Sequence, residues 1–310
     1  MYLSNYKIPV KGKGEIEIST EILYKKGDKV PCRDPFIMLY GDNYLLYRSM
    51  GNQGIGCLVS DDLENWSAPV MVYRTPENFH GVKDFYWAPE CHYYKGNFYI
   101  FTSVFSSRTN HRNISVYRAD NPFGPFVDIA NRCVGKPEWD TIDGTLYVDE
   151  DGQPWMVFVH EWTSMDDGIG SMAVVKLTPD LARFDSEPIE IFKAKDVPWA
   201  RNRITDGPYV YKTAQGKLMM IWSNHSENGY AVAKLYSSNG KIDGRWIHED
   251  LLYDKGIQSD CIYDGGHAML FFDKEEKLRL AFHTPNDRKV DVAHLSIKEV
   301  VEKDGTIVLK

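Results

Sequence analysis

The stretch RDPFIMLYGDNYLLYRS, residues 33–49, places an acidic residue before an apolar run, which a Gly-containing turn joins to a second apolar run. Four later stretches repeat this pattern: WAPECHYYKGNFYIFTS (87–103), DGTLYVDEDGQPWMVFVH (143–160), DGPYVYKTAQGKLMMIWS (206–223) and GGHAMLFFDKEEKLRLAFHT (265–284). A polar residue stands at or near the head of each stretch, at spacings of 56, 53, 63 and 61 residues: Asp34, Glu90, Asp143, Asp206 and His267. The chain is therefore a five-fold repeat.

A second feature repeats with nearly the same period. Each of the first four stretches is followed by a polar turn that ends in an aromatic residue, at spacings of 60, 58 and 62 residues: Trp66, Phe126, Phe184 and Trp246. A β-rich repeat of about 60 residues suits one four-stranded blade of a propeller, in which the first strand of every blade lines a central channel. The sequence therefore predicts an all-β fold, a five-bladed β-propeller with four-stranded antiparallel blades around that channel.

The repeat runs without a break, so we expect one domain over residues 1–310. A ring of blades must be closed, and in propellers a strand from one terminus commonly completes the last blade. Two terminal stretches are candidates for this strand, EIEISTEILY (15–24) and HLSIKEVVEKDGTIVLK (294–310). Helical periodicity is nearly absent, and the candidates are short: a turn around SDDLENW (60–66) and a helix over SIKEVVE (296–302).

Composition excludes several classes of function. The net charge is −8 and the Lys and Arg residues form no basic run, which argues against nucleic acid because that ligand needs clustered cations. The 14 Phe, 8 Trp and 19 Tyr suit packed sheets and a pocket that stacks on sugar rings. The 5 Cys have no CxxC spacing, so neither a disulfide framework nor a zinc site is indicated. No long apolar run is present, and we expect no membrane segment and a cytoplasmic location.

Three of the repeated positions carry carboxylates beside residues that shape the backbone. Asp34 precedes Pro35, and both Asp143 and Asp206 precede a Gly. Radial closure should bring the three carboxylates to one channel mouth, where their repulsion raises at least one pKa while another stays low. This division supplies the general acid and the general base of glycoside hydrolysis. Carboxyl groups about 6.5–9.5 Å apart give inversion, and groups about 5 Å apart give retention.

The five stretches, in this order and at this spacing, resemble glycoside hydrolase family 43, whose members are five-bladed propellers that act mainly on arabinose- and xylose-containing polysaccharides. The resemblance covers essentially the whole chain. It implies that Asp34 is the general base that activates water and that Asp143 orients the acid and keeps its pKa high. Asp206 falls where the family usually has a Glu general acid in an E-G-P sequence. Because Asp is one methylene shorter, Glu161 of VFVHEW is the alternative proton donor.

Four further residues are candidates to surround the substrate. Trp87 resembles the aromatic wall beside the sugar that is cleaved, and Glu90 sits where many relatives have Asp, as a polar neighbour in the channel. His267 matches a family histidine that often contacts a bound ion through water. A structural calcium ion near the channel centre is therefore an expectation, although the chain has no Asp-rich calcium loop. Arg203 is a candidate to bind a sugar hydroxyl or an acid, and no organic cofactor is required.

These features predict an inverting, exo-acting glycosidase that removes α-L-arabinofuranosyl or β-D-xylosyl units from oligosaccharides of plant polysaccharides. Its partner is then an oligosaccharide, with no nucleic acid and no membrane, and the sequence does not decide between a monomer and a homo-oligomer. Two alternatives stay open. A non-catalytic sugar-binding propeller would keep Trp87 and lose the acid, which Asp at position 206 allows. A five-bladed phosphorylase would need a basic phosphate site near the acids, for which Arg33, Arg201 and Arg203 are candidates.

Overall fold

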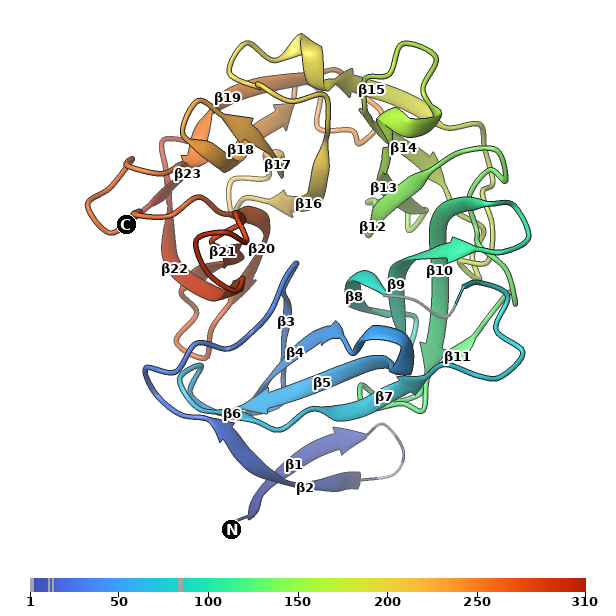
Figure 1. Ribbon diagram of the computed structural model, residues 1–310, viewed down its shortest axis with the longest axis vertical. Helices are drawn as coiled ribbons and strands as arrows, with labels where there is room; N and C mark the ends of the chain where they lie inside the picture. The colour runs from blue at the N-terminus through green and yellow to red at the C-terminus, as the bar shows by residue number, and fades with distance from the viewer. Residues whose placement is uncertain (1–2, 11, 13, 83–85) are drawn as a thin grey trace.

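The computed structural model describes residues 3–10, 12, 14–82 and 86–310, and its strands form a ring of sheets around a central channel (Figure 1). Within these residues the strands make five four-stranded antiparallel sheets and one three-stranded sheet. The five four-stranded sheets are the blades of a propeller, and each blade is built from one continuous part of the chain. The predicted five-bladed, all-β propeller is confirmed.

Within each blade the strands follow one another in chain order from the channel outward. Blade 1 contains β3 (Phe36–Tyr40), β4 (Asn43–Ser49), β5 (Gly54–Ser60) and β7 (Val70–Arg74). Blade 2 contains β8 (Trp87–Tyr94), β9 (Asn97–Ser106), β10 (His111–Ala119) and β11 (Val127–Asp128). Blade 3 contains β12 (Thr141–Val148), β13 (Pro154–His160), β14 (Ser171–Lys176) and β15 (Ile189–Lys193). Blade 4 contains β16 (Asp206–Lys212), β17 (Leu218–Ser226), β18 (Gly229–Ser237) and β19 (Trp246–Tyr253), and blade 5 contains β20 (Gly266–Phe272), β21 (Leu278–Thr284), β22 (His294–Lys303) and β23 (Thr306–Leu309).

The hairpins form where the sequence offers residues that tolerate a left-handed backbone. In the turn between β8 and β9, Lys95 and Gly96 have φ values of 45° and 87°, and Tyr94 pairs with Asn97 across them. Such a two-residue turn matches the twist of the strands that it joins. Middle strands such as β5 and β13 are buried at every residue, because both of their faces lie between neighbouring blades. The apolar core therefore fills the spaces between blades and leaves the channel to polar side chains.

The ring closes between blade 5 and blade 1. The C-terminal strand β23 completes blade 5, whereas the N-terminal strands β1 (Leu3–Val10) and β2 (Gly14–Tyr24) form the three-stranded sheet with β6 (Trp66–Ser67), outside blade 1. Hydrogen bonds from the Cys32 N–H to the Ala293 carbonyl (3.1 Å) and from the Leu295 N–H to the Val30 carbonyl (2.9 Å) tie the two blades together. The helix predicted over residues 296–302 is wrong, because this segment lies in β22 and pairs with β21 and β23.

Helical structure is short in the part of the chain that the structure describes. It consists of three 3₁₀ helices, η1 (Gly51–Gln53), η2 (Trp162–Ser164) and η3 (Ala194–Asp196). Across these same described residues, no helix has the length and apolar character that a membrane crossing requires.

Each inner strand carries, at or near its start, a residue in the left-handed region of backbone conformation. The φ values of these five residues lie between 43° and 54°: Asp34, Ala88, Asp143, Gly207 and His267. In blades 2 to 5 the pairing register of the inner strand shifts at this point, which is the mark of a β-bulge. This repeated bulge corrects the alignment drawn from the sequence. Ala88 and Gly207 are the equivalents of Asp34, and Glu90 and Asp206 lie beside the repeated position.

Candidate active site

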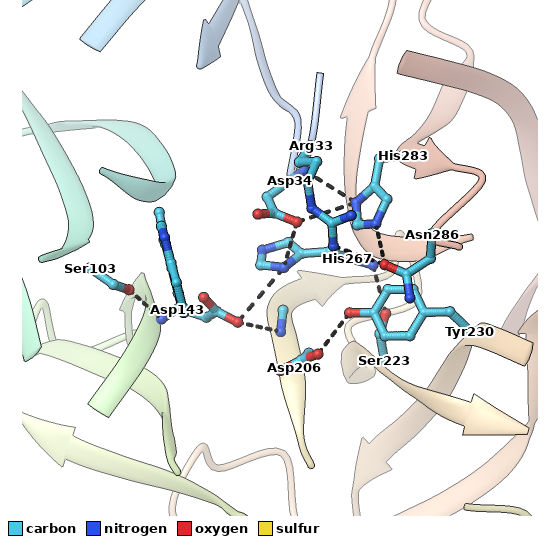
Figure 2. Close-up of polar contacts among 12 residues, drawn as sticks. Arg33, Asp34, Ser103, Asp143, Asp206, Ser223, Tyr230, His267, His283 and Asn286 are labelled. Carbon is cyan, nitrogen blue, oxygen red and sulfur yellow. Dashed lines mark hydrogen bonds and ion pairs between the residues drawn. The ribbon is translucent and has the colours of Figure 1, made fainter. Parts of the chain in front are cut away.

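A cavity of about 810 Å³ opens at the channel mouth, and its lining residues come from all five blades. Six residues that the sequence predicts for the site line it: Asp34, Trp87, Asp143, Glu161, Asp206 and His267. Figure 2 shows the three aspartates converging around His267. A concave pocket with a few convergent polar groups is the usual form of a site for a small ligand.

Asp34 is held by two histidines of blade 5. Its Oδ1 lies 3.3 Å from His267 Nδ1, and its backbone N–H donates to His283 Nδ1 over 3.2 Å. The other nitrogen of His283, Nε2, lies 3.1 Å from Asn286 Oδ1, and the same oxygen accepts a hydrogen bond from Arg33 Nη2 (2.8 Å). His283 Nδ1 also lies 3.2 Å from Asp34 Oδ1, so this histidine contacts both the backbone N–H and the carboxylate of Asp34.

The charges around Asp34 favour its ionised form. Burial raises the pKa of the Asp34 carboxyl, but the nearby positive charge of His267, with smaller effects of His283 and Arg33, outweighs it and leaves the pKa below its ordinary value. Burial lowers the pKa of His267, but Asp34, Asp143 and Asp206 together raise it above its ordinary value. The two shifts favour the charged form of each group, and Asp34 has the charge of a general base.

Asp143 is buried between blades 3 and 4. Its backbone N–H donates to Ser103 Oγ (3.0 Å) in blade 2, and its Oδ2 accepts the N–H of Gly207 (3.1 Å) in blade 4. The same Oδ2 lies 3.7 Å from His267 Nδ1. Burial, with the charge of Asp34, raises the pKa of Asp143 to about 6, although His267 and the Gly207 N–H oppose the shift. Asp143 is therefore fixed to the backbone that carries the next carboxylate.

Asp206 has the protonation expected of a general acid. Burial and the charge of Asp143 raise its pKa to about 7, while His267 and a hydrogen bond from the Tyr230 hydroxyl to its Oδ2 (3.0 Å) act in the opposite direction. The Tyr230 ring in turn stacks on His283, with ring centroids 5.7 Å apart. A carboxyl group with a pKa near 7 can donate a proton at neutral pH, which an ordinary Asp cannot.

Glu161 and Trp87 line another side of the cavity. Glu161 follows β13, and burial, followed by the charges of Asp143 and Asp140, raises its pKa to about 7. Trp87 is 41% exposed, and the guanidinium carbon of Arg112 lies 3.6 Å from the centroid of its ring. This cation–π contact holds the indole in place at the cavity wall. Glu161 therefore has the charge state, as well as the location, of a second proton donor.

Two predicted residues lie away from the cavity lining. Glu90 is buried in β8, two residues beyond the bulge at Ala88, and its Oε2 lies 2.9 Å from His92 Nε2. Its charge reaches the site as one of the smaller effects that raise the pKa values of His267 and Asp143. Arg203 packs over Trp162, with its guanidinium carbon 3.6 Å from the ring centroid. Neither side chain therefore lines the cavity that holds the three aspartates.

Sequence reasoning missed Tyr230, His283, Ser103 and Ser223, which hold the predicted residues in place. Ser223 Oγ accepts the N–H of His267 over 2.8 Å, as Ser103 does for Asp143. A signal for three of them was present, because Ser103, Ser223 and His283 stand at or next to the ends of the repeated stretches. Tyr230 follows its stretch and belongs to no repeated position.

The family resemblance implies a bound calcium ion near His267. Calcium prefers six to eight oxygen ligands. Among the described residues, no group of three or more His, Cys, Asp and Glu side chains is placed to hold a metal ion. His267 instead directs Nδ1 toward Asp34 and Asp143. These residues do not form a calcium cage of their own, and the ion stays a prediction on which no catalytic step below depends.

A five-bladed propeller carries three carboxylates at one channel mouth, one with a lowered pKa and one with a pKa raised to about 7. This is the architecture expected of a glycoside-hydrolase propeller. The chain belongs to the glycosyl hydrolases family 43, whose family model matches residues 29–307. The match includes all five blades and every cavity carboxylate described above.

The proteins that it resembles include enzymes named for arabinose- or xylose-containing substrates. The chain is 29% identical over 178 residues to the extracellular exo-alpha-(1->5)-L-arabinofuranosidase ArbA of Cellvibrio japonicus (strain Ueda107). This match spans 52% of this chain and 48% of that protein, so it covers about half of each. It is 31% identical to an endo-arabinase from Bacteroides thetaiotaomicron VPI-5482, with a TM-score of 0.79 over 91% of this chain and 99% of that one. An endo-1,4-beta-xylanase from the same organism is 25% identical, with a TM-score of 0.76 over 91% and 95% of the two chains.

Proposed function

We propose that this protein is an inverting, exo-acting glycosidase that removes α-L-arabinofuranosyl units, or β-D-xylosyl units, from the ends of oligosaccharides. The observation that carries the proposal is the division of charge in one cavity. Asp34 has a pKa below its ordinary value, whereas Asp206 has a pKa raised to about 7. An ionised base and a protonated acid are the two groups that hydrolysis of a glycosidic bond with inversion requires.

Each residue then has a defined step. Asp34 accepts a proton from water as that water attacks the anomeric carbon, and His267 holds Asp34 in place and ionised. Asp206 gives its proton to the departing glycosidic oxygen. Asp143 keeps the pKa of Asp206 high through its charge and fixes Gly207, the residue after Asp206, through a hydrogen bond of 3.1 Å. The Tyr230 hydroxyl stabilises the Asp206 carboxylate that proton transfer leaves behind.

Two features support the substrate and the mode of attack. The relatives include an arabinofuranosidase named as exo-acting and an endo-arabinase, so arabinose-containing chains are the substrate that they favour. A cavity walled by residues from all five blades suits a chain end better than the middle of a chain. Of the three arginines predicted for a phosphorylase, Arg201 is paired with Glu227 (2.6 Å) and Arg203 with Trp162, and only Arg33 lines the cavity.

The test is hydrolysis of a panel of nitrophenyl glycosides and of short arabino- and xylo-oligosaccharides, with the anomer of the product followed by NMR. We expect release of single terminal sugars with inversion, and loss of at least about 10³-fold in turnover in Asp34→Ala. Asp42→Asn, in the exposed β3–β4 turn, is the matched control and should keep wild-type turnover. Retention of configuration, or cleavage inside the oligosaccharide, would overturn the inverting or the exo assignment respectively.

A second variant separates the two proton donors. Glu161→Gln removes a charge that raises the pKa of Asp206, so the basic limb of the pH profile should move to lower pH while turnover persists below it. If Glu161 is instead the acid, this variant loses activity on oligosaccharides at every pH. Binding of the oligosaccharides without turnover in wild type would favour the sugar-binding propeller, with Asp206 as the cause.

A further inference from the structure

The cavity has a basic side that the proposed reaction does not use. Three arginines line it: Arg33, Arg48 and Arg288. They come from blade 1 and from the loop of blade 5 between β21 and β22, whereas Asp143 and Asp206 come from blades 3 and 4. The arginines thus lie where blades 1 and 5 meet, a sector that they share with Asp34 and Asp291. Figure 1 shows this junction between the blue and the red blade.

The backbone brings these arginines together. Arg33 Nη2 donates to Asn286 Oδ1 (2.8 Å), and Asn286 lies two residues before Arg288. Arg48 Nη1 donates to the carbonyl of Pro31 (2.5 Å), two residues before Arg33, and Pro31 pairs with His294 at the start of β22. The closure between blades 5 and 1 therefore fixes Arg33 and Arg48, and it sets Arg288 beside them.

None of the three arginines forms an ion pair with a carboxylate of a described residue, although the charge of Arg33 contributes to the lowered pKa of Asp34. Arg33 and Arg48 use the contacts just described on a neutral amide and a neutral carbonyl, and Arg288 is exposed, with no hydrogen bond or ion pair to any residue that the structure describes. Asp291 lines the same side of the cavity, but it is paired with Lys29. Guanidinium groups with free donors at a pocket wall are the usual receptor for a planar oxyanion, which they bind with two parallel hydrogen bonds.

We propose that this arginine wall binds a carboxylate carried by the substrate, so that the enzyme prefers oligosaccharides in which a uronic acid lies at or next to the unit that is cleaved. The inference rests on the proposed glycosidase activity, because a uronic acid is the form in which a sugar chain brings a carboxylate into such a cavity. A free phosphate ion is another oxyanion that the same arginines could bind. If the arginines instead bind neutral sugar hydroxyls, a carboxylate on the substrate gives no advantage.

The experiment uses a matched pair of oligosaccharides, one with a uronic acid and the other with that carboxyl group reduced to the alcohol. We expect the kcat/KM of wild type to be about tenfold or more higher for the uronic acid compound than for the reduced compound, which is the effect of a charge-assisted hydrogen bond. This ratio should decrease at high salt. In Arg288→Gln the ratio should fall toward one. Arg288→Lys should keep an intermediate ratio, because lysine retains the charge but cannot form the two parallel hydrogen bonds of a guanidinium group. Arg245→Gln, an exposed arginine before β19, is the control and should keep the wild-type ratio. A wild-type ratio of one, with both compounds cleaved, overturns the inference and leaves the proposed function standing.

Binding measurements keep the two proposals separable. In Asp34→Ala, which cannot turn over, calorimetry should show tighter binding of the uronic acid compound than of its reduced partner, and the difference should vanish when Arg288→Gln is added. This result with no hydrolysis by wild type would sustain the arginine wall and reject the glycosidase. Turnover that depends on added inorganic phosphate and yields a sugar 1-phosphate would assign the wall to phosphate and overturn the uronic acid site. Thermal unfolding of every variant confirms that each is folded.

Discussion

Blade 3 and blade 4 use the same bulge in different ways. In blade 3 the left-handed residue is itself a carboxylate, Asp143, whereas in blade 4 it is Gly207 and the carboxylate, Asp206, stands one residue earlier. His267 of blade 5 accounts for the difference. A Cβ added to Gly207 would lie 2.8 Å from Cγ and Cδ2 of the His267 ring. Blade 4 therefore leaves its bulge position without a side chain, which makes room for the histidine, and the acid occupies the flanking position.

The two blades also differ in what accepts the N–H of the bulge residue. Asp143 donates to Ser103 of the preceding blade, but Gly207 donates to the carboxylate of Asp143. The pairing registers explain this, because Ser103 and Val159 occupy matching positions in β9 and β13, and valine offers no acceptor. The Asp143 carboxylate instead accepts the N–H of Gly207. The orientation of Asp206, the residue before Gly207, therefore depends on the charge of Asp143.

The largest expected effect on turnover comes from replacing Asp206, the carboxylate beside the bulge of blade 4. Asp206→Asn keeps the size of the side chain and removes its proton, so turnover of oligosaccharides should fall by about 10²–10⁴-fold. Nitrophenyl substrates should suffer less, because their leaving group needs little protonation. Asp143→Asn is the comparison variant, since its amide oxygen can still accept the Gly207 N–H. Its basic limb should move to lower pH, because the charge that raises the pKa of Asp206 is lost. An equal loss on both kinds of substrate in Asp206→Asn would contradict the assigned role.

The next effect tests why one blade needs glycine. Gly207→Ala adds a methyl group against His267 at a φ of 48°, and we expect a loss of about 1–3 kcal/mol in the free energy of unfolding together with a marked fall in activity. Ala88 occupies the equivalent position of blade 2 at a φ of 43° and already carries a Cβ, so Ala88→Gly should change the free energy of unfolding by less than about 1 kcal/mol. Urea denaturation measures both, and equal costs would mean that the histidine does not set the requirement.

The sequence could predict the five blades but not the arrangement of the backbone and side chains at the channel mouth. Alternating apolar runs, Gly-containing turns and an even spacing suffice for five hairpins, since each hairpin is local. The bulge is not visible in this pattern, and neither is the need for glycine at position 207. The space for a side chain there is taken by His267, which is 60 residues later and reaches Gly207 only through ring closure. For the same reason the pattern aligns Glu90 with the other acids, and it does not reveal that the Arg203 guanidinium packs over Trp162.

A smaller effect concerns the hydroxyl that holds the acid. The hydrogen bond from Tyr230 lowers the pKa of Asp206, so Tyr230→Phe should raise that pKa and move the basic limb of the kcat/KM profile above about 7, to higher pH. The rate below the limb should fall several-fold, because the carboxylate formed on proton transfer loses a donor. A stopped assay from about pH 5 to about pH 9 gives both quantities. A limb that moves to lower pH would show that the Tyr230 oxygen accepts a hydrogen bond from protonated Asp206 instead of donating one.

The smallest effect extends the comparison to the hydroxyls that receive the bulge N–H groups. Ser103→Ala leaves the buried N–H of Asp143 without an acceptor, which should lower the free energy of unfolding by about 1–3 kcal/mol. Ser49 stands at the matching end of β4 in blade 1, but its Oγ accepts only a longer hydrogen bond from the Gly51 N–H (3.3 Å) near solvent. Ser49→Ala should therefore cost less than about 0.5 kcal/mol, because water can replace the hydroxyl. If the two variants unfold at the same urea concentration, the hydrogen bond to Ser103 does not stabilise the bulge. The position of Asp143 would then depend on its contacts with Gly207 and His267.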